Sequence, residues 1–314
     1  MVPRAEFTSY YGRPVVKASP WQHDIPAYLF LGGVAAGSSL LSAGADLTRR
    51  PVLRRTGRLG ALLGLTLSMI ALVKDLGRPA RFHHMLRVAK PTSPMSMGTW
   101  ILTLYGPFAA LAGAAELRPL LPRRLRDGLA GRLLGLGARP AGLTAAVVAP
   151  AVASYTAVLL TDTATPTWHD AHRHLPFVFV GSACAASGGL GLLAAPLGEA
   201  EPARRLAVGG ALLELAVEHR MERSMGITAE PLHDGHAGSL MRASRALTVA
   251  GAAGALVGRR SRVLSAVSGA ALMAGSACLR FGVFEAGQES ARDPRYTVVP
   301  QRERVQQRGR TRSG

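Results

Sequence analysis

The chain has 314 residues, of which 48% are hydrophobic and 18% charged, and its formal net charge is +18. The apolar content excludes a disordered chain, and only two cysteines exclude a secreted disulfide scaffold. A large positive charge is typical of nucleic-acid-binding proteins when the basic residues share an exposed face. Here Lys and Arg form short clusters between long apolar segments, which is typical of a protein that crosses a lipid bilayer several times. We therefore expect no nucleic-acid partner.

Eight apolar segments follow one another along the chain, and a helix needs about 20 mostly apolar residues to cross a bilayer. We predict an all-α integral membrane protein with eight transmembrane helices in two four-helix bundles. The sixth and seventh segments are short, so seven spans is the alternative. In chain order the segments are residues 28–45, 59–76, 98–117, 141–160, 175–195, 206–217, 246–257 and 264–279.

Small residues recur in five of these segments, as in Gly32-Gly33-Val34-Ala35-Ala36-Gly37. Small side chains let helix backbones approach closely in lipid, where hydrophobic collapse cannot drive association. This pattern predicts a compact helix bundle and says nothing of an activity.

The distribution of Lys and Arg predicts the orientation of the chain in the membrane. The loops after the odd-numbered spans hold 16 of these residues, and the loops after the even-numbered spans hold 9. The odd loops are therefore predicted to be cytoplasmic, with both termini outside. The first apolar run begins near Ile25 without a following cleavage site, so we expect it to remain in the membrane as a helix.

The chain divides into three predicted regions. Residues 1–162 form a first four-helix bundle with the denser polar chemistry, and residues 163–281 form a second four-helix bundle. Residues 282–314 form an extramembrane tail that is rich in Arg. The two halves show no convincing self-similarity, so we expect them to differ in function.

Histidines and cysteines limit the redox groups that this chain can hold. All nine histidines fall outside the middle of every predicted span, so no pair can face each other across a haem. Cys184 and Cys278 lie alone in separate spans, which excludes a four-thiolate iron–sulfur cluster. His233 and His236 are too few for a zinc site, and no metal is predicted. Electrons would have to pass through a diffusible substrate or a partner.

All nine histidines also fall on the predicted outer side of the membrane. Because His titrates near neutral pH, such a surface can exchange protons. The alternative is that polar outer loops collect histidines by chance.

The second span ends in a charged cluster that begins with Asp75 and continues with Arg78, Arg81 and His84. A carboxylate at this depth is unfavourable unless it is paired, and Arg78 or Arg81 is close enough in sequence to pair with it. The alternative is a helix C-terminus with arginines that extend toward the interface. The cluster predicts a catalytic Asp75 and Arg81, with Arg78 and His84 as binding residues.

Further polar residues are predicted at the same depth. His23 and Tyr28 lie at the outer start of the first span, Trp100 opens the third, and Tyr155 lies near the outer end of the fourth. A quinone headgroup needs hydrogen-bond donors, a proton acceptor and an apolar channel for its tail, and the His, Asp, Arg and Tyr residues at this depth could supply them. We predict that Tyr155 and His23 are catalytic residues that bond the quinone oxygens, and that Tyr28 and Trp100 are binding residues. Trp21, Tyr28 and Trp100 also fit the aromatic belt of membrane proteins, which is the preferred interpretation for Trp21.

Two acidic residues, Glu214 and Glu218, lie within the sixth span and toward its outer end. An ionisable group inside the bilayer is a functional candidate, so both are candidates for a proton pathway. The alternative is a Glu buried between helices and hydrogen-bonded to Ser or Thr.

Seven short segments between about Trp21 and Gln301 resemble, in the same order, segments of one known family. They are YLFLGGVAAG (28–37), DLGRPARF (75–82), SPMSMGTW (93–100), YTAVLL (155–160), PTW (166–168), RFGVFEAG (280–287) and SARDP (290–294). On these segments the sequence resembles the NrfD/polysulfide reductase membrane-subunit family.

The resemblance implies an eight-helix protein of a bacterial inner membrane that binds menaquinone or another quinone and carries no haem or iron–sulfur cluster. It also implies docking to an iron–sulfur subunit and, through it, to a molybdoenzyme-type catalytic subunit. By position, Asp75 and Arg81 match quinone-site residues of the family, and Tyr155 matches its span-four tyrosine. His23 is a looser match.

The leading hypothesis is a quinone-reactive membrane subunit of a respiratory oxidoreductase complex, with proton release or uptake near the outer face. The alternatives are a secondary transporter and a purely structural membrane anchor. The two halves show no corresponding pair of broken spans, which argues against a transporter with inverted repeats. The terminal substrate would belong to another chain.

Overall fold

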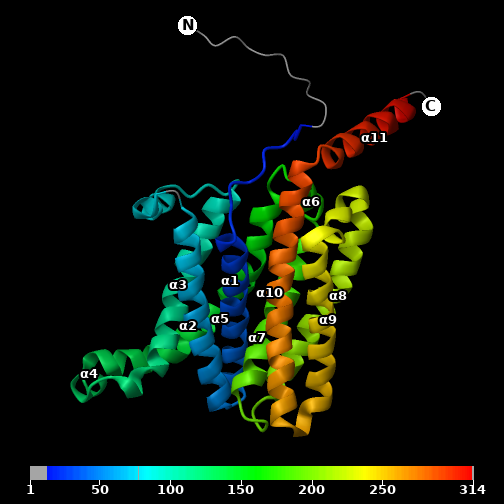
Figure 1. Cartoon of the computed structure of the whole chain (residues 1–314). Coiled ribbons are helices and arrows are strands. Elements are labelled where there is room, and N and C mark those ends of the chain that lie inside the picture. Colours follow the sequence, from blue (N-terminus) through cyan, green and yellow to red (C-terminus); the bar gives the residue numbers. More distant parts are fainter. Residues whose placement is uncertain (1–12, 77, 313–314) are drawn as a thin grey trace.

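The computed structural model describes residues 13–76 and 78–312, and every regular element in this part of the chain is a helix. Eight long helices run roughly side by side (Figure 1). Each coincides with one of the eight predicted apolar segments, so the all-α prediction is confirmed. Their bounds are α1 (Asp24–Leu47), α2 (Pro51–Asp75), α3 (Pro94–Glu116), α5 (Leu129–Thr161), α7 (Leu175–Ala194), α8 (Glu201–Met225), α9 (Gly235–Val257) and α10 (Arg262–Arg292).

Shorter helices connect the long ones or follow them. They are η1 (Pro79–Arg87), η2 (Arg118–Leu120), α4 (Arg123–Asp127), α6 (Pro166–Asp170), η3 (Gly226–Leu232), η4 (Gly258–Arg260) and α11 (Arg295–Arg312).

Five long helices, α1, α2, α5, α7 and α10, are long and apolar enough to cross a membrane by length and composition. Helices α8 and α9, which correspond to the short sixth and seventh segments, have 25 and 23 residues. Both extend well beyond their apolar segments because charged turns continue each helix toward one end of the bundle. Helix α10 likewise continues past residue 281, where the tail was predicted to begin, and ends at Arg292.

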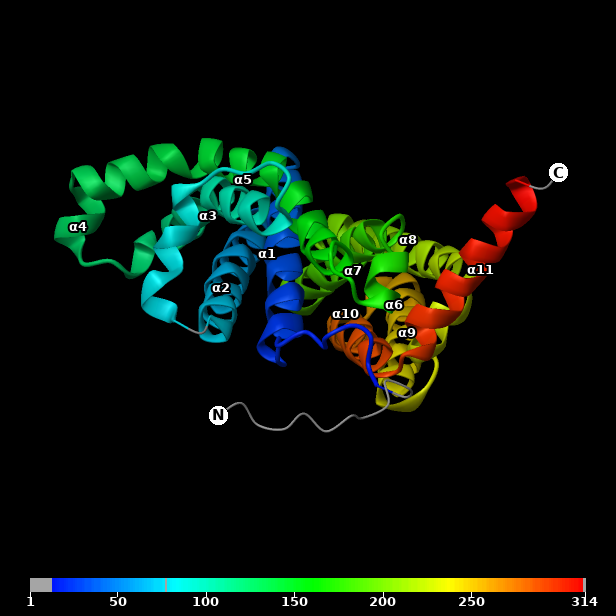
Figure 2. The same cartoon turned by 90° about the horizontal axis from the view of Figure 1, so that it is seen from above.

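The most extensive helix contacts are between long helices that follow one another in the sequence. Extensive contacts join α1 with α2, α3 with α5, α7 with α8, and α9 with α10. Helix α1 also contacts α5, α7 and α10, so it lies between α2 and α5 on one side and α7 and α10 on the other (Figure 2). Of these five helices, α1 is the most deeply buried within the protein: 78% of its most apolar 18-residue stretch is buried.

Glycine permits the closest helix contacts. A Cβ atom on Gly57 of α2 would lie 2.8 Å from the Ser38 carbonyl oxygen of α1. A Cβ atom on Gly189 of α7 would lie 2.6 Å from the Gly269 carbonyl oxygen of α10. Both distances are too short for a carbon atom, so any side chain there would force the helix backbones apart. The predicted role of small residues in helix packing is therefore visible at these two crossings.

Replacement of Gly189 by Leu is expected to destabilise the bundle by about 1–3 kcal/mol, the usual cost of overpacking a well-packed interior. The measurement is the midpoint of thermal unfolding of the purified protein in detergent. Gly209→Leu is the matched control, because a Cβ atom on Gly209 of α8 would meet nothing within 4 Å. Equal midpoints for the two variants would contradict the close α7–α10 contact.

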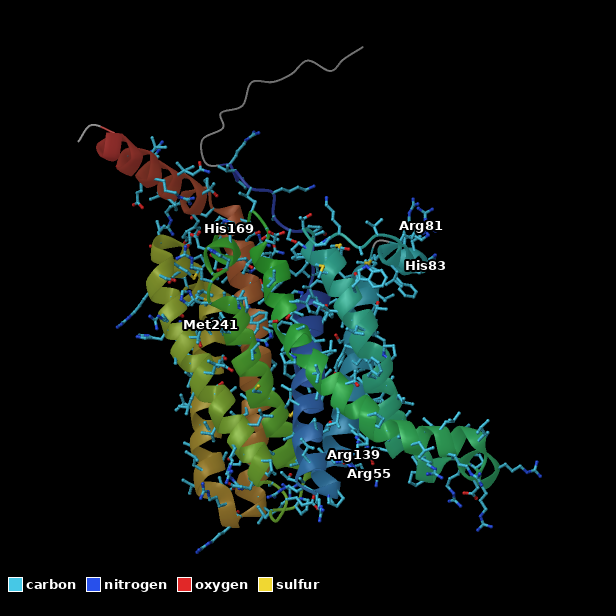
Figure 3. All side chains as sticks on the ribbon, turned by 180° about the vertical axis from the view of Figure 1, so that it is seen from behind. Arg55, Arg81, His83, Arg139, His169 and Met241 are labelled. Carbon is cyan, nitrogen blue, oxygen red and sulfur yellow. The ribbon has the colours of Figure 1, made fainter. Side chains whose placement is uncertain are left out.

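The nine histidines all lie at one end of the bundle, where α1 begins and α10 ends. Figure 3 shows His83 and His169 at this histidine end, and Arg55 and Arg139 at the opposite arginine end. The histidines precede α1, lie in η1 or around α6, or occupy the last turns of α8 and the start of α9. The structure confirms that the nine histidines share one end of the helix bundle.

Candidate functional site

Two tyrosines form the centre of the candidate site at the histidine end. The hydroxyls of Tyr28 on α1 and Tyr155 on α5 share a hydrogen bond, and both side chains are buried. The Tyr155 ring packs directly on Gly98 of α3, where any Cβ atom would collide with it. The structure thus brings together two predicted site residues from helices that are far apart in sequence.

Tyr155 also lines a cavity of about 250 Å³ between the start of α3, the segment before it and the last turns of α5. The other walls are mostly apolar, with Met97, Ile101 and Val158 among them, and the polar residues Thr92 and Ser154 also contribute. A phenol at the edge of a largely apolar cavity can donate a hydrogen bond to a ligand oxygen.

A second cavity of about 240 Å³ lies between α2, α3 and η1. Its walls are almost entirely apolar and include Met69, Leu102 and Phe82. Met85 and Thr99 also line a neighbouring cavity of about 260 Å³, to which His84, Lys90, Ser93 and Ser96 contribute further polar groups. The two cavities share Met85 and Thr99 in their walls, so the apolar cavity borders a more polar one. We call this second cavity the polar mouth; it contains the predicted binding residue His84.

The serines of the 93–100 segment shape this mouth. The Ser93 hydroxyl accepts a hydrogen bond from the Ser96 amide and caps α3. The Ser96 hydroxyl donates to the Val88 carbonyl and accepts from the Lys90 amide, at 2.9 and 3.0 Å. The Trp100 indole donates to the same Val88 carbonyl at 3.4 Å. Trp100 therefore supports the connection between η1 and α3 and is not among the residues that line these cavities.

Asp75 is the last residue of α2 and is partly buried. The Gln22 backbone amide and the Asp24 carboxylate lie close to it. Within the described residues, Asp75 forms no ion pair with Arg78 or Arg81, contrary to the pairing considered from the sequence. The reason is that the chain leaves α2 in an extended conformation and enters η1.

Both of these arginines are exposed in the structure. Figure 3 shows Arg81 at the edge of the histidine end, away from the helix bundle. The structure therefore does not bring Arg78 and Arg81 to the tyrosine pair.

His23 contacts the second half of the protein. Its Nε2 lies 3.2 Å from a Glu285 carboxylate oxygen of α10, and its ring stacks on Phe281 at 6.5 Å between centroids. Trp21 packs on Trp168, with the ring centroids 6.0 Å apart. These contacts attach the segment before α1 to α6 and α10. Trp21 therefore packs against protein, whether or not it also lies at the membrane interface.

A second polar group lies in the interior of the last four long helices. Glu214 of α8 is fully buried and accepts a hydrogen bond from the Thr248 hydroxyl of α9 at 3.1 Å. Arg280 of α10 is close enough to Glu214 for electrostatic attraction. The Arg280 guanidinium also donates to the Phe179 carbonyl at 2.9 Å and lies over the Phe179 ring at 3.7 Å. Sequence reasoning missed this role of Arg280, because the residue was taken as the boundary of the eighth span.

Glu218 lies one helical turn beyond Glu214, toward the histidine end. Its carboxylate accepts a hydrogen bond from Arg245 of α9 at 2.9 Å. Arg245 also bonds Glu222, which lies 3.8 Å from His233. Polar side chains thus continue from the interior of the bundle to its histidine end.

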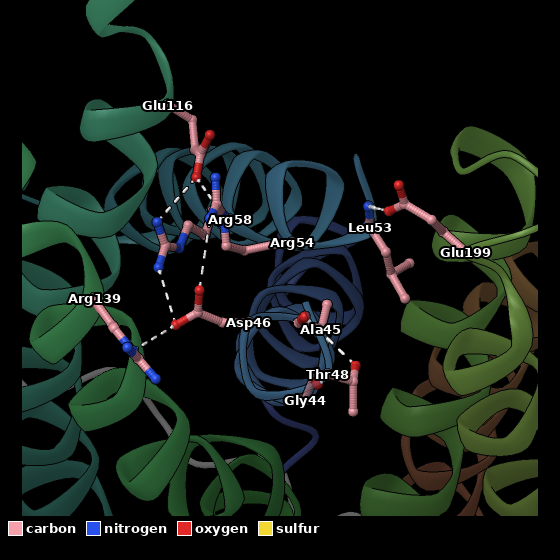
Figure 4. A network of polar contacts seen from close by, with 10 residues as sticks. All are labelled: Gly44, Ala45, Asp46, Thr48, Leu53, Arg54, Arg58, Glu116, Arg139 and Glu199. Atoms are coloured by element: carbon pink, nitrogen blue, oxygen red, sulfur yellow. Dashed lines mark hydrogen bonds and ion pairs between the residues drawn. The ribbon is translucent and has the colours of Figure 1, made fainter. Parts of the chain in front are cut away.

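A third group of charges lies at the arginine end and joins four helices (Figure 4). Arg58 of α2, which is only 6% exposed, donates to Glu116 of α3 at 2.9 Å and lies 3.9 Å from Asp46 of α1. Arg54 contacts the same two carboxylates, and Arg139 of α5 lies 3.3 Å from Asp46. The sequence places Arg58 in a loop, but α2 begins at Pro51 and buries it. We regard this charge network as structural.

No three residues of the types His, Cys, Asp and Glu come together as a metal site in the part of the chain that the structure describes. Cys184 and Cys278 are free and lie on α7 and α10. Quinone binding, and the roles of the individual site residues, stay predictions.

A protein-family comparison decides the relationship. The family model described as "Polysulphide reductase, NrfD" matches residues 15–208, from before α1 into α8. The chain belongs to the NrfD family. NrfD proteins are membrane subunits of polysulfide and molybdoenzyme-type reductases, and they typically work with iron–sulfur and catalytic subunits. The resemblance noted in the sequence is thus confirmed, and the chain is a multi-pass membrane protein. A search of curated proteins found no match.

Proposed function

We propose that this NrfD protein is the quinone-reactive membrane subunit of a respiratory oxidoreductase complex. It exchanges electrons between menaquinone or another quinone and an iron–sulfur subunit, which passes them to or from a molybdoenzyme-type catalytic subunit. The observation that carries the proposal is the buried Tyr28–Tyr155 pair at the edge of a largely apolar cavity. It gives the membrane bundle an oriented hydrogen-bond donor at a depth that a quinone can reach.

In this proposal Tyr155 holds one quinone oxygen, and Tyr28 fixes the orientation of the Tyr155 hydroxyl. A bound quinol supplies two electrons and two protons to the reaction. Asp24 lies one turn before Tyr28 on α1, so the two side chains share a helix face. Asp75 lies close to Asp24, and we assign Asp75 as the general base that passes the proton toward the histidine end.

The other predicted residues have secondary roles in this proposal. His84 lies at the polar mouth between η1 and α3, where it can bond an oxygen of an entering or leaving quinone. His23 and its partner Glu285 lie at the surface of the histidine end and can release protons to water. Arg81 and Arg78 are exposed and form no ion pair with Asp75 within the described residues, so this proposal gives them no direct part in the proton transfer.

We further propose that all eight long helices cross the membrane as two four-helix bundles, with the histidine end outside the bacterial inner membrane. The larger number of basic residues in the loops of the arginine end supports this orientation. Both described ends of the chain lie at the histidine end of the bundle, which supports an even number of spans with both termini on the same side.

The orientation makes a direct prediction. A reporter inserted within residues 118–139 is expected to read as cytoplasmic, and one within residues 81–90 as external. Paired alkaline phosphatase and green fluorescent protein fusions measure this. The opposite pattern would place the tyrosine site on the cytoplasmic face and require a cytoplasmic iron–sulfur partner.

A proton route through the second half is a separate part of the proposal. Glu214 and Glu218 would carry protons between the bundle interior and Glu222 and His233 at the histidine end. The contacts from Glu218 through Arg245 to Glu222 support it. The alternative is that Thr248, Arg280 and Arg245 only stabilise two buried carboxylates.

The test of the proposed function is extraction and quantification of quinone from the purified complex. We expect about one quinone for each copy of this chain, and loss of that quinone in a Tyr155→Phe variant that still assembles. A fully assembled wild-type complex that carries no quinone and oxidises no quinol would favour the structural anchor instead.

A further inference from the structure

Residues 118–139 form a projection that the quinone site does not use. We name it the arginine elbow; it comprises η2, α4 and the first turns of α5. Figures 1 and 2 show α4 and the start of α5 extending sideways from the helix bundle, near the arginine end. A segment in this position lies beside the helices, where the bilayer surface would be.

The length of α5 supports this placement. The helix has 33 residues, which corresponds to about 50 Å at 1.5 Å per residue. The hydrocarbon core of a bilayer is only about 30 Å thick. Pro140 lies inside α5, and prolines are a common cause of kinks in helices. The turns before Pro140 therefore have no need to continue through the core.

One face of the elbow is apolar and exposed. Leu129, Leu133 and Leu136 are 73%, 58% and 78% exposed. Their spacing of four and three residues puts them on one face of α5. Leu120 and Leu125 add exposed apolar surface on η2 and α4. An apolar face of this kind is unfavourable in water and stable at the boundary between headgroups and acyl chains.

Positive charge accompanies the apolar face. Arg123, Arg124 and Arg132 are exposed, and none of them forms an ion pair with any residue that the structure describes. The other arginines of the elbow are engaged within the protein. Arg118 donates to the Arg126 carbonyl at 3.1 Å, and Arg126 lies 3.2 Å from Asp127.

The elbow is also fixed to the bundle at its base. Arg139 reaches Asp46 of α1, and Arg118 packs across Gly135, where a Cβ atom would lie 2.9 Å from the guanidinium. The exposed leucines and arginines therefore belong to a segment whose base is anchored to the helix bundle.

We infer that the arginine elbow binds anionic phospholipid headgroups at the membrane surface. Guanidinium groups form bidentate hydrogen bonds with phosphate oxygens, and a basic amphipathic segment is attracted by the negative surface potential of a bilayer. A bilayer covers the leucine face and the arginines together, whereas a soluble acidic partner would satisfy only the charges. This lipid site does not depend on the proposed quinone function.

The first measurement uses the full-length protein in detergent with a headgroup-labelled phosphatidylglycerol as probe. The variant is Arg123→Gln/Arg124→Gln/Arg132→Gln. Each basic residue near a charged surface changes lipid affinity by about fivefold, so we expect the triple variant to lose about a hundredfold. The matched control is Arg55→Gln/Arg259→Gln/Arg260→Gln, which removes the same charge from exposed arginines of the same end. An equal loss in both variants would overturn the site.

The second measurement reports where the elbow lies. A spin label at a Leu129→Cys variant, with both native cysteines replaced by Ala, is compared in discs of phosphatidylcholine alone and in discs with 30% phosphatidylglycerol. We expect the label to become more accessible to oxygen and less accessible to a water-soluble nickel chelate in the anionic discs. A label that stays in water in both discs would overturn the lipid assignment and indicate a protein partner.

Discussion

Replacement of Asp75 by Asn is expected to lower quinol turnover by about 10²–10⁴-fold, the range typical of the loss of a general base. Asn keeps the size and most hydrogen bonds of Asp but cannot accept the proton. The side chain lies at the end of α2, beside the Gln22 amide and Asp24, and only partly buried. Steady-state oxidation of a soluble menaquinol analogue by the assembled complex gives the rate.

Asp162→Asn is the matched control for this experiment. Asp162 follows α5 at the same end of the bundle, is exposed, and forms no ion pair within the described residues. Its replacement should leave turnover unchanged. Should Asp75→Asn assemble and turn over quinol at the wild-type rate, Asp75 is only the end of a helix and the base lies elsewhere.

Replacement of Arg58 by Met is expected to destabilise the protein by about 3 kcal/mol. Breaking a buried ion pair commonly costs 3–5 kcal/mol, because it leaves an uncompensated buried charge. The lower end applies here, since Arg54 still contacts Glu116 and Arg139 still contacts Asp46. Because Met keeps most of the packing volume of the Arg side chain, the loss of stability reports mainly on the removed charge. The midpoint of thermal unfolding in lipid discs measures it.

Arg55→Met tests the same change at an exposed position of the same helix, where no described residue forms an ion pair with the arginine. Its midpoint should match the wild type. A double variant with Arg58→Met and Glu116→Gln should recover part of the loss, because the carboxylate that Arg58 neutralised is then gone. A single Arg58→Met variant as stable as Arg55→Met would show that the network carries no stability.

The positions of the long helices could be predicted because a membrane imposes one simple requirement on sequence, a run of apolar residues of fixed length. Where charged turns continue a helix beyond its apolar segment, as in α8, α9 and the end of α10, hydropathy underestimates the length of the helix. The location of the nine histidines at one end of the bundle could also be predicted, because successive spans alternate in direction and this fixes the side of each loop. The contact between Tyr28 and Tyr155 was anticipated only as a shared depth, since depth does not determine which helices are neighbours.

Side-chain partners were the least predictable feature. Sequence proximity suggested that Arg78 or Arg81 would neutralise Asp75, but the chain direction after α2 separates them. Conversely, Arg58 and Arg280 seemed to be boundary residues and are buried among charges or carbonyls from distant helices. Such pairings depend on how helices rotate about their axes, and a single sequence contains no direct record of that rotation.

The central position of α1 has a consequence for how the protein is made. This helix leaves the ribosome before the other described helices, yet several of its contacts are with α5, α7 and α10, which are synthesised later. The Ser187 hydroxyl of α7, for instance, donates to the Val34 carbonyl of α1 at 3.0 Å. Until α7 inserts, the face of α1 that packs on it has only lipid or the insertion machinery as neighbours. Chains truncated before α7 should therefore be substrates for membrane proteases, and completion of the second half stabilises the first.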